Sequence, residues 1–330
     1  MDLTYRPRRL RRTNSLREMV RENTVSASDF IYPLFVHEGS DTQEIAAMPG
    51  TSRWSIDGLI DEVKRAWNLG IRCVVIFPKV PDEQKTEDGA ECFNEKGLIP
   101  RTIERLKKEI PEMCVMTDVA LDPYSCDGHD GIVSDDGIIL NDATVNYLCK
   151  QAVVQARAGA DLIGPSDMMD GRVGLIRDTL DKNGFINVQI MSYAVKYASA
   201  FYGPFRDAVG SSINLSNKSK NSYQMDPKNS DEALREIELD LNEGADMVII
   251  KPGMPYLDII HKVREKFKVP TYAYQVSGEY SMIKGAIDKG WFDEEKIIFE
   301  SLIAFKRAGC SGIITYFAPY EAEILNNRKI

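Results

Sequence analysis

The chain has 330 residues, of which 43% are hydrophobic and 28% are charged, and its formal net charge is −9. This composition is typical of a soluble globular protein, and it excludes a disordered chain, a collagen and a disulfide scaffold. The acidic balance argues against a protein that binds nucleic acid as a whole, and the length allows one large domain or two medium ones.

Membrane and export signals are missing from the sequence. No run approaches the roughly eighteen consecutive apolar residues that a membrane span needs, and the first residues lack the apolar core of a signal peptide. The six cysteines include no CxxC pair. We therefore expect a cytoplasmic protein with reduced thiols that does not associate with membranes.

The first 28 residues are basic, whereas the rest of the chain is acidic. Seven arginines stand against three carboxylates there, so this segment carries +4 and the other 302 residues carry −13. A nucleic-acid-binding arm and an organelle transit peptide are two interpretations. The acidic residues and the RPRRL run that leads into the folded part favour a third: an arm over 1–28 that contacts the body or an acidic neighbouring subunit, followed by a domain over 29–330.

From residue 30 onward, short apolar runs rich in β-branched residues alternate with longer helical stretches. Continuous apolar runs such as CVVIF and MVII are typical of strands buried on both faces, as in a parallel sheet. The eight predicted strands are Ile31–Val36, Cys73–Pro78, Cys114–Asp122, Leu162–Ser166, Val188–Tyr193, Met247–Pro252, Thr271–Ser277 and Gly312–Ala318.

Three of the stretches between these strands carry clear helix signals. We predict helices over Ser55–Leu69, Asn141–Ala158 (with an Asn-Asp cap) and Ser230–Glu243 (with Ser230 as N-cap). The junctions ARAGADLI, LNEGADMV and KRAGCSGI each place a glycine where a left-handed residue ends a helix before a strand. This recurrence indicates repeated β-α geometry.

Eight strands that start about 40 residues apart predict an α/β fold, a closed (β/α)8 barrel. An open doubly wound sheet is the alternative, weakened because no GxGxxG follows the first strand. The long segments 79–100, 122–141 and 203–230 are expected to be loops over the carboxyl ends of the strands, where function usually resides.

Polar side chains gather where these strands end, which is the face that carries the chemistry of such barrels. In chain order they are Asp118 and Asp122, Ser166, Lys196 just past the fifth strand, Lys251, Tyr274 with Gln275 and Ser277, and Tyr316.

Lys251 and Lys196 are the sharpest of these signals. A lysine after the apolar run VII is partly desolvated, and a second ammonium nearby lowers its pKa further. Two uncharged amines on neighbouring strands could face one pocket and form Schiff bases with a ketone; a snorkelling or carboxylate-paired lysine is the alternative. Arg206 suits a substrate carboxylate, unless it pairs with Asp207 at the surface.

These residues lie in long motifs that resemble porphobilinogen synthase, also called 5-aminolevulinate dehydratase, over almost the whole chain. The motifs are RPRRLR, AMPG, DVALDPY with GHDG, PSDMMDGR, MSYAVKYASAFYGPFR, SYQMDP, KPGMPYLDI and QVSGEYSMIK. The resemblance implies a (β/α)8 barrel with an N-terminal arm, and a hydro-lyase that joins two 5-aminolevulinate molecules into porphobilinogen with loss of two waters. This is an early step of haem and chlorophyll synthesis.

The resemblance also implies roles for the strand-end residues. Lys251 and Lys196 would each hold one substrate as a Schiff base, with the iminium acidifying the neighbouring carbon for carbon–carbon bond formation. Asp118 would lie near the amino group or orient a proton acceptor.

Four further residues would bind the two substrate carboxylates. Arg206 would bind one of them together with Lys220, which stands where the family carries a second arginine and keeps the charge without the bidentate fork. Lys220 lies in SSINLSNKSKNSY, a stretch suited to a mobile lid or to a plain surface loop. Ser277 and Tyr316 would bind the other carboxylate.

The metal pattern differs from that of zinc-dependent relatives. The positions matching their three cysteines are Ala120, Asp122 and Asp130, and Cys126 with His129 does not replace three thiolates, so we expect no catalytic zinc. Asp122 and Asp130 are candidate ligands of an active-site cation such as Mg²⁺, unless they are simply solvated.

An allosteric Mg²⁺ site is implied outside the pocket, near a subunit interface. Its ligand would be Glu236 of LREIELD, with Asp170 of MMDGR in the outer shell, since Mg²⁺ keeps most of its waters; without the resemblance, Glu236 is an exposed helix residue. The family assembly is a homo-octamer of arm-exchanging dimers, which agrees with the basic arm and the acidic body.

Two other hypotheses compete with this one. A one-lysine class I aldolase on a similar barrel would stay active without Lys196. A nucleic-acid-binding protein would act through the arginine arm, but the acidic body and the missing base-stacking pattern argue against it.

Overall fold

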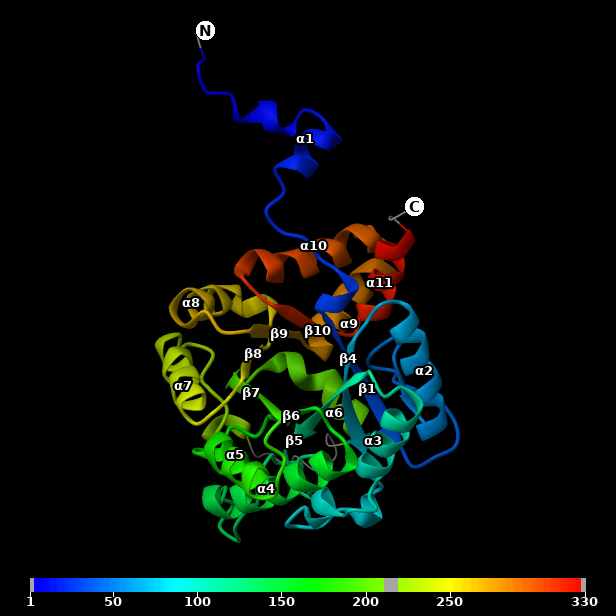
Figure 1. Cartoon of the computed structure of the whole chain (residues 1–330), viewed down its shortest axis with the longest axis vertical. Helices are drawn as coiled ribbons and strands as arrows, with labels where there is room; N and C mark the ends of the chain where they lie inside the picture. The colour runs from blue at the N-terminus through cyan, green and yellow to red at the C-terminus, as the bar shows by residue number, and fades with distance from the viewer. Residues whose placement is uncertain (1–2, 211–218, 328–330) are drawn as a thin grey trace.

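The computed structural model describes residues 3–210 and 219–327. Eight parallel strands pair side by side in chain order, and the last pairs with the first, so the sheet closes into a barrel (Figure 1). The barrel strands are β1 Phe30–His37, β4 Cys73–Lys79, β5 Cys114–Val119, β6 Leu162–Pro165, β7 Gln189–Lys196, β8 Met247–Lys251, β9 Thr271–Gln275 and β10 Gly312–Thr315. The predicted (β/α)8 barrel is confirmed, and the open doubly wound alternative is wrong.

The seam of the barrel lies between β1 and β10, where Phe30 is the register partner of Ile313. Two short strands, β2 (Gln43–Glu44) and β3 (Ser52–Trp54), extend the sheet beside β1. They place Arg53 next to the segment that follows β7, since its guanidinium donates to the carbonyls of Asp207 and Ala208.

Helices surround the strands (Figure 1). The α-helices are α1 Asn14–Met19, α2 Ile56–Asn68, α3 Leu98–Glu109, α4 Asn141–Ala158, α5 Arg172–Lys182, α6 Gly203–Val209, α7 Asp231–Asn242, α8 Leu257–Phe267, α9 Ser277–Asp288, α10 Glu294–Ala308 and α11 Ala318–Asn327. The 3-10 helices are η1 Pro7–Arg11, η2 Ala27–Asp29, η3 Asp82–Gln84, η4 Ala90–Phe93, η5 Ala200–Tyr202, η6 Lys220–Ser222 and η7 Met254–Tyr256.

The three repeated junctions end their helices as predicted. Gly159, Gly244 and Gly309 have φ angles of 109°, 104° and 110°, the left-handed region that favours glycine. Each glycine turns the chain directly from a helix into the next strand, so three of the helix-to-strand connections use the same turn.

One predicted helix cap is wrong, and a second lacks the expected side-chain hydrogen bond, although both helices form. Asn141 and Asp142 are the first helical residues of α4, and the Asn141 side chain instead hydrogen-bonds the backbone of Asp170. Ser230 is the N-cap residue of α7, as predicted, but its hydroxyl accepts from Lys262 and makes no capping hydrogen bond to the helix backbone. In both places, a partner distant in sequence takes the polar side chain.

Three predicted boundaries also differ from the structure. β5 ends at Val119, and the backbone N–H of Leu121 then donates to the backbone carbonyl of Asp130 (3.2 Å), which holds the following loop against the end of the strand. β7 continues to Lys196, so this lysine is the last residue of the strand rather than just past it. The segment 203–230 is not a plain loop, since it contains α6 and η6, and positions 211–218 lie outside the described residues.

The N-terminal segment with η1 and α1 extends away from the barrel (Figure 1). Most of its large apolar side chains are exposed, with Tyr5 at 89%, whereas Leu16 is half-buried. Within residues 3–210 and 219–327, no helix combines the length and apolar character that crossing a membrane requires.

Candidate active site

Lys251 ends β8 inside an aromatic enclosure. Its side chain is buried, and its Nζ lies 4.8–5.4 Å from the centroids of four rings, which belong to Tyr193, Tyr202, Phe205 and Tyr274. Burial lowers the pKa of Lys251 to about 7, and the positive charge of Lys196 adds to the effect. A large fraction of this amine is therefore neutral near pH 7, as Schiff-base chemistry requires.

Lys196 is the register partner of Lys251 on the neighbouring strand, which confirms the predicted adjacency. Its ammonium contacts the carboxylate of Asp130 at 3.3 Å and the backbone carbonyl of Ser166. Burial opposes the charge on Lys196, but Asp130, Asp122 and Asp118 together raise its pKa above the ordinary value. The expectation of two uncharged amines is therefore wrong for Lys196, because the loop after β5 brings a carboxylate to it.

Asp118, Asp122 and Asp130 lie near Lys196, and their carboxyl groups differ in pKa. Burial raises the pKa of Asp118, whose Oδ1 has no hydrogen-bond partner among the described residues. Burial and the neighbouring Asp130 raise the pKa of Asp122 to about 7. Burial opposes the charge on Asp130 as well, but Lys196 and Lys220 hold its pKa well below the usual range. Asp130 is thus the permanent anion, whereas Asp122 can exchange protons near neutral pH, and burial makes Asp118 easier to protonate than an ordinary aspartate.

Lys220 and Arg206 are brought together as predicted. Both line a cavity of about 300 Å³, with Gln224 beside them. Lys220 is buried and its Nζ contacts Asp130 at 3.1 Å, while Gln224 donates to the same carboxylate. No salt bridge to Arg206, whether from Asp207 or another residue, is present within the described ranges. Arg206 therefore lines this cavity beside Lys220, and the predicted alternative of an ion pair with Asp207 is not formed in the described part of the chain.

Ser277 and Tyr316 are both buried near the carboxyl ends of β9 and β10. Ser277 is the first residue of α9 rather than a strand residue, and its hydroxyl accepts from the backbone N–H of Phe205 (2.9 Å). The hydroxyl of Tyr316 hydrogen-bonds that of Tyr274 (2.9 Å). Ser277 is thus tied to the segment that carries Arg206, and Tyr316 to the enclosure of Lys251.

Glu279 is a site residue that the sequence analysis missed. It is fully buried in the first turn of α9, and its carboxylate accepts from the backbone N–H groups of Gly253, Met254 and Val276. Burial raises its pKa to about 7. Glu279 therefore fixes the turn that follows Lys251, and the capping pattern V-S-G-E at the start of α9 was the available signal.

The aromatic enclosure was also missed, apart from Tyr274. The hydroxyl of Tyr193 is buried and has no hydrogen-bond partner among the described residues. The available signal was the density of aromatic residues in SYAVKYASAFYGPF, where Tyr193, Tyr202 and Phe205 lie within twelve residues of one another. The sequence places these residues around Lys196 and does not indicate that they surround Lys251.

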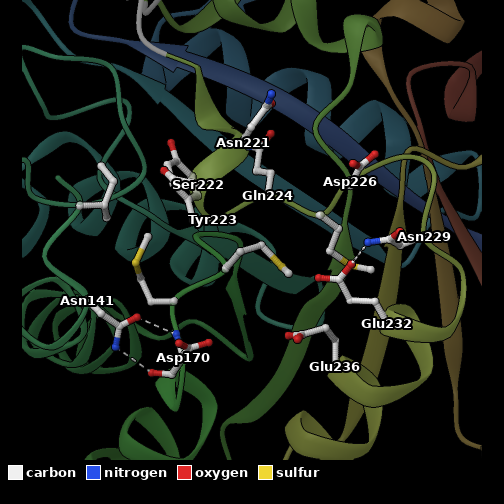
Figure 2. Close-up of a pocket in the computed structure, with 14 residues that line it drawn as sticks. Asn141, Asp170, Asn221, Ser222, Tyr223, Gln224, Asp226, Asn229, Glu232 and Glu236 are labelled. Atoms are coloured by element: carbon white, nitrogen blue, oxygen red, sulfur yellow. Dashed lines mark hydrogen bonds between the residues drawn. The ribbon is translucent and has the colours of Figure 1, made fainter. Parts of the chain in front are cut away.

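Glu236 and Asp170 line a separate polar pocket of about 440 Å³ (Figure 2). Glu236 and Glu232 belong to α7, and Asp170 is held opposite by Asn141, which accepts from its N–H at 2.8 Å. Burial raises the pKa of Glu236, and the nearby carboxylates raise it further. The structure thus brings together the two residues expected at an allosteric cation site.

In residues 3–210 and 219–327, no three histidine, cysteine, aspartate or glutamate side chains are grouped so that they could hold a metal ion, either inside the barrel or at the pocket of Glu236. Asp130 is engaged by two lysines, and Cys126 is exposed. A cation on Asp122 and Asp130 would have to displace these ammonium groups.

Comparisons with known proteins agree with this geometry. The model of the family described as delta-aminolevulinic acid dehydratase matches residues 4–324. The enzyme of that name from Bradyrhizobium diazoefficiens is 54% identical over 329 residues, covering 99% of this chain and 93% of the relative. The chloroplastic enzyme from Oryza sativa subsp. japonica is 54% identical over 327 residues, covering 98% and 76%.

A solved structure is similar over nearly its full length. Delta-aminolevulinic acid dehydratase (porphobilinogen synthase) from Toxoplasma gondii ME49, in complex with the reaction product porphobilinogen, matches with a TM-score of 0.97 and 49% identity. The match covers 99% of this chain and 95% of that one. The chain therefore belongs to the delta-aminolevulinic acid dehydratase family.

Proposed function

We propose that the chain condenses two 5-aminolevulinate molecules into porphobilinogen through Schiff bases on Lys251 and Lys196. The family supplies the reaction, a hydro-lyase step of tetrapyrrole biosynthesis that releases two waters. One observation carries the assignment of residues: a buried lysine with a pKa of about 7 is the register partner of a second buried lysine.

Lys251 reacts first in this proposal, because its amine is the one that is neutral near pH 7. The nitrogen attacks the ketone carbon of one substrate and passes a proton to the carbonyl oxygen, which gives the carbinolamine. A second proton, from a buried acid such as Asp122, lets the hydroxyl group leave as water and gives an iminium ion. The iminium withdraws electrons from the neighbouring carbon, which then loses a proton more readily. The faces of the four surrounding rings stabilise the cation.

Lys196 must lose a proton before it can attack the second substrate. Asp118 is a suitable acceptor, because burial raises its pKa and one of its oxygens has no hydrogen-bond partner in the described part of the chain. Asp130 then remains paired with Lys220, which limits the cost of leaving a buried anion. The two covalent attachments would hold two identical molecules in different, fixed orientations.

The substrate carboxylates have two separate binding regions. Arg206 and Lys220 supply two positive charges to one cavity, which suits the carboxylate of one substrate. Ser277 and Tyr316 supply hydroxyl groups to the other carboxylate, after exchanging their present protein partners for it. The two regions therefore differ in chemistry: one binds its carboxylate with positively charged groups, and the other binds its carboxylate with neutral hydroxyl groups.

A magnesium ion fits the pocket of Glu236, with Asp170 as an outer-shell partner. Carboxylate oxygens suit this hard cation, and the pocket leaves room for its waters. The crowded carboxylates, which raise the pKa of Glu236, favour a cation that neutralises them. The proposal includes no catalytic zinc, and Asp122 with Asp130 stays a candidate cation site only in a state where both Lys196 and Lys220 have released Asp130.

The assembly and the location follow the same resemblance. We propose a homo-octamer of arm-exchanging dimers, because the extended segment before β1 exposes arginines and apolar side chains that the barrel of the same chain does not cover. The cytoplasmic location expected from the sequence stays a prediction.

A colour assay for the pyrrole product tests the function. The native chain, supplied with Mg²⁺, should form porphobilinogen from 5-aminolevulinate, and both Lys251→Ala and Lys196→Ala should abolish it. Lys266→Ala is the matched control, since Lys266 lies in an exposed pair with Glu238 and its loss should leave the rate unchanged. A one-lysine aldolase predicts activity in Lys196→Ala, and a native chain that forms no pyrrole would reject the proposal.

A further inference from the structure

A bulge in β7 decides which residue faces Lys251. Ser192 pairs with Val248, but beyond it the pairing resumes at Val195, one residue out of step with the partner strand. If the first register continued, Val195 would lie opposite Lys251. The extra residue therefore places Lys196 there instead, and a slip of one residue would turn its side chain to the other face of the strand.

Arg172 fills the space beside this bulge. Its side chain comes from the first turn of α5, is 2% exposed, and directs Nη2 to the hydroxyl of Ser192 and the carbonyl of Tyr193, both at 3.3 Å. A bulge leaves backbone polar groups without strand partners, and a buried carbonyl needs a donor. The Arg172 guanidinium supplies that donor at the irregular point of β7.

Asp240 contacts both Arg172 and Ser192. This buried residue of α7 accepts from the Ser192 hydroxyl at 2.6 Å and contacts both terminal nitrogens of Arg172 at 3.3 and 3.4 Å. Burial opposes a charge on Arg172, but Asp240 and Asp167 raise its pKa above the ordinary value. The bulge is thus held between a helix on each side by a buried ion pair.

The third side of the Arg172 guanidinium faces the end of β6. Its Nε lies 3.5 Å from Asp167, and its Nη1 donates to the carbonyl of Met169. Asp167 follows Ser166, whose backbone carbonyl accepts from Lys196. Arg172 therefore touches both segments that determine where the Lys196 amine lies.

We infer that Arg172 is a positioning residue, which holds the bulge of β7 and thereby sets Lys196 opposite Lys251. The inference rests on the proposed function, because it concerns where the second Schiff base forms. Apolar side chains of similar volume would fill the same space, whereas a buried ion pair with directed hydrogen bonds fixes one register of the strand.

Trapping each lysine separately tests this role. The native chain, Arg172→Lys and Asp240→Asn are incubated with 5-aminolevulinate and borohydride, and the Lys196 and Lys251 adducts are measured by peptide mass mapping. We expect the Lys251 adduct to stay within about twofold of native, while the Lys196 adduct and kcat fall about tenfold or more, because small misplacements of reacting groups have large effects on rate.

Arg177→Lys is the matched control on the same helix. Arg177 also donates to backbone carbonyls, but those of Phe185 and Val188 precede the start of β7, whereas Lys196 is at its end. Its replacement should lower the melting temperature without changing the ratio of the two adducts. An equal fall of both adducts in Arg172→Lys, or an unchanged ratio in the folded variant, would overturn the inference.

Ser192→Ala decides the matter if Arg172→Lys does not fold. This variant removes only the hydroxyl shared by Arg172 and Asp240, and it should also lower the Lys196 adduct selectively. An unchanged ratio in Ser192→Ala would then contradict the positioning role. Absence of both adducts from the native chain would reject the proposed function itself.

Discussion

Replacing Lys196 by methionine should make Lys251 more basic, because it removes a second ammonium from the surroundings of Lys251. The pKa of Lys251 is lowered to about 7, first by burial and then by Lys196. Compared with an ordinary lysine, this corresponds to about 5 kcal/mol against the charged amine. The variant also frees Asp130 from one of its two lysines, and this negative charge would raise the pKa of Lys251 further.

The expected size of the effect follows from the order of these causes. At pH 7 about half of the Lys251 amines are neutral, against roughly one in three thousand for an ordinary lysine. Lys251 stays buried in Lys196→Met, so only the smaller part of its pKa decrease, the part caused by Lys196, is reversed. We expect the pH midpoint of Schiff-base formation at Lys251 to rise by about one pH unit and to stay below the ordinary lysine value.

The assay uses 4-oxopentanoate, which keeps the ketone and carboxylate of the substrate and lacks its amino group. Borohydride reduction between about pH 6 and pH 10, followed by mass analysis of the Lys251 peptide, gives the midpoint. Lys196→Arg keeps the positive charge and should leave the midpoint near that of the native chain. A native midpoint near that of an ordinary lysine, or equal midpoints in native and Lys196→Met, would refute the electrostatic reasoning.

Three further outcomes follow from the site. Arg206→Ala should raise KM for 5-aminolevulinate by about tenfold or more and should still form the Lys251 adduct. Arg206→Lys should raise KM less, because it keeps the positive charge. An unchanged KM in Arg206→Ala would contradict the role of Arg206 in binding the carboxylate. Glu279→Gln should lower the melting temperature more at pH 5 than at pH 8. In the folded native chain the pKa of Glu279 is about 7, which is higher than in the unfolded chain. The contribution of Glu279 to folding stability is therefore full below about pH 4.5 and is lost as the pH rises through 7. A melting-temperature difference between native and Glu279→Gln that does not change with pH would contradict this. EDTA should weaken activity or assembly, and Mg²⁺ should restore it in the native chain but not in Glu236→Ala; restoration by zinc alone would overturn the metal assignment.

The strand and helix pattern made the barrel predictable from sequence. Continuous apolar runs and the recurring glycine junctions specify local structure, and eight such units leave few ways to bury their apolar surface. The ends of the strands were less predictable. β7 passes beyond Tyr193 because its pairing with β8 resumes after a bulge, and no local pattern marks such a shift.

The charge state of Lys196 could not be predicted from its own neighbours in sequence. The apolar strand around Lys196 indicates desolvation, but its pKa depends on Asp130, which the loop after β5 brings back from a distant part of the chain. The same holds for Lys220, whose polar stretch is suited to a lid or a surface loop and does not predict that the lysine is buried against that carboxylate. Arg172 stood in the quoted motif PSDMMDGR, yet its contacts with β7 and α7 exist only in the folded chain.

The most direct test of the two-lysine account is the mass of the whole chain and of its peptides after reduction with borohydride in saturating 5-aminolevulinate. The account predicts chains that carry substrate-derived adducts at Lys251 and at Lys196, with the Lys251 adduct formed first. Adducts at Lys251 alone, under conditions where pyrrole accumulates, would contradict it.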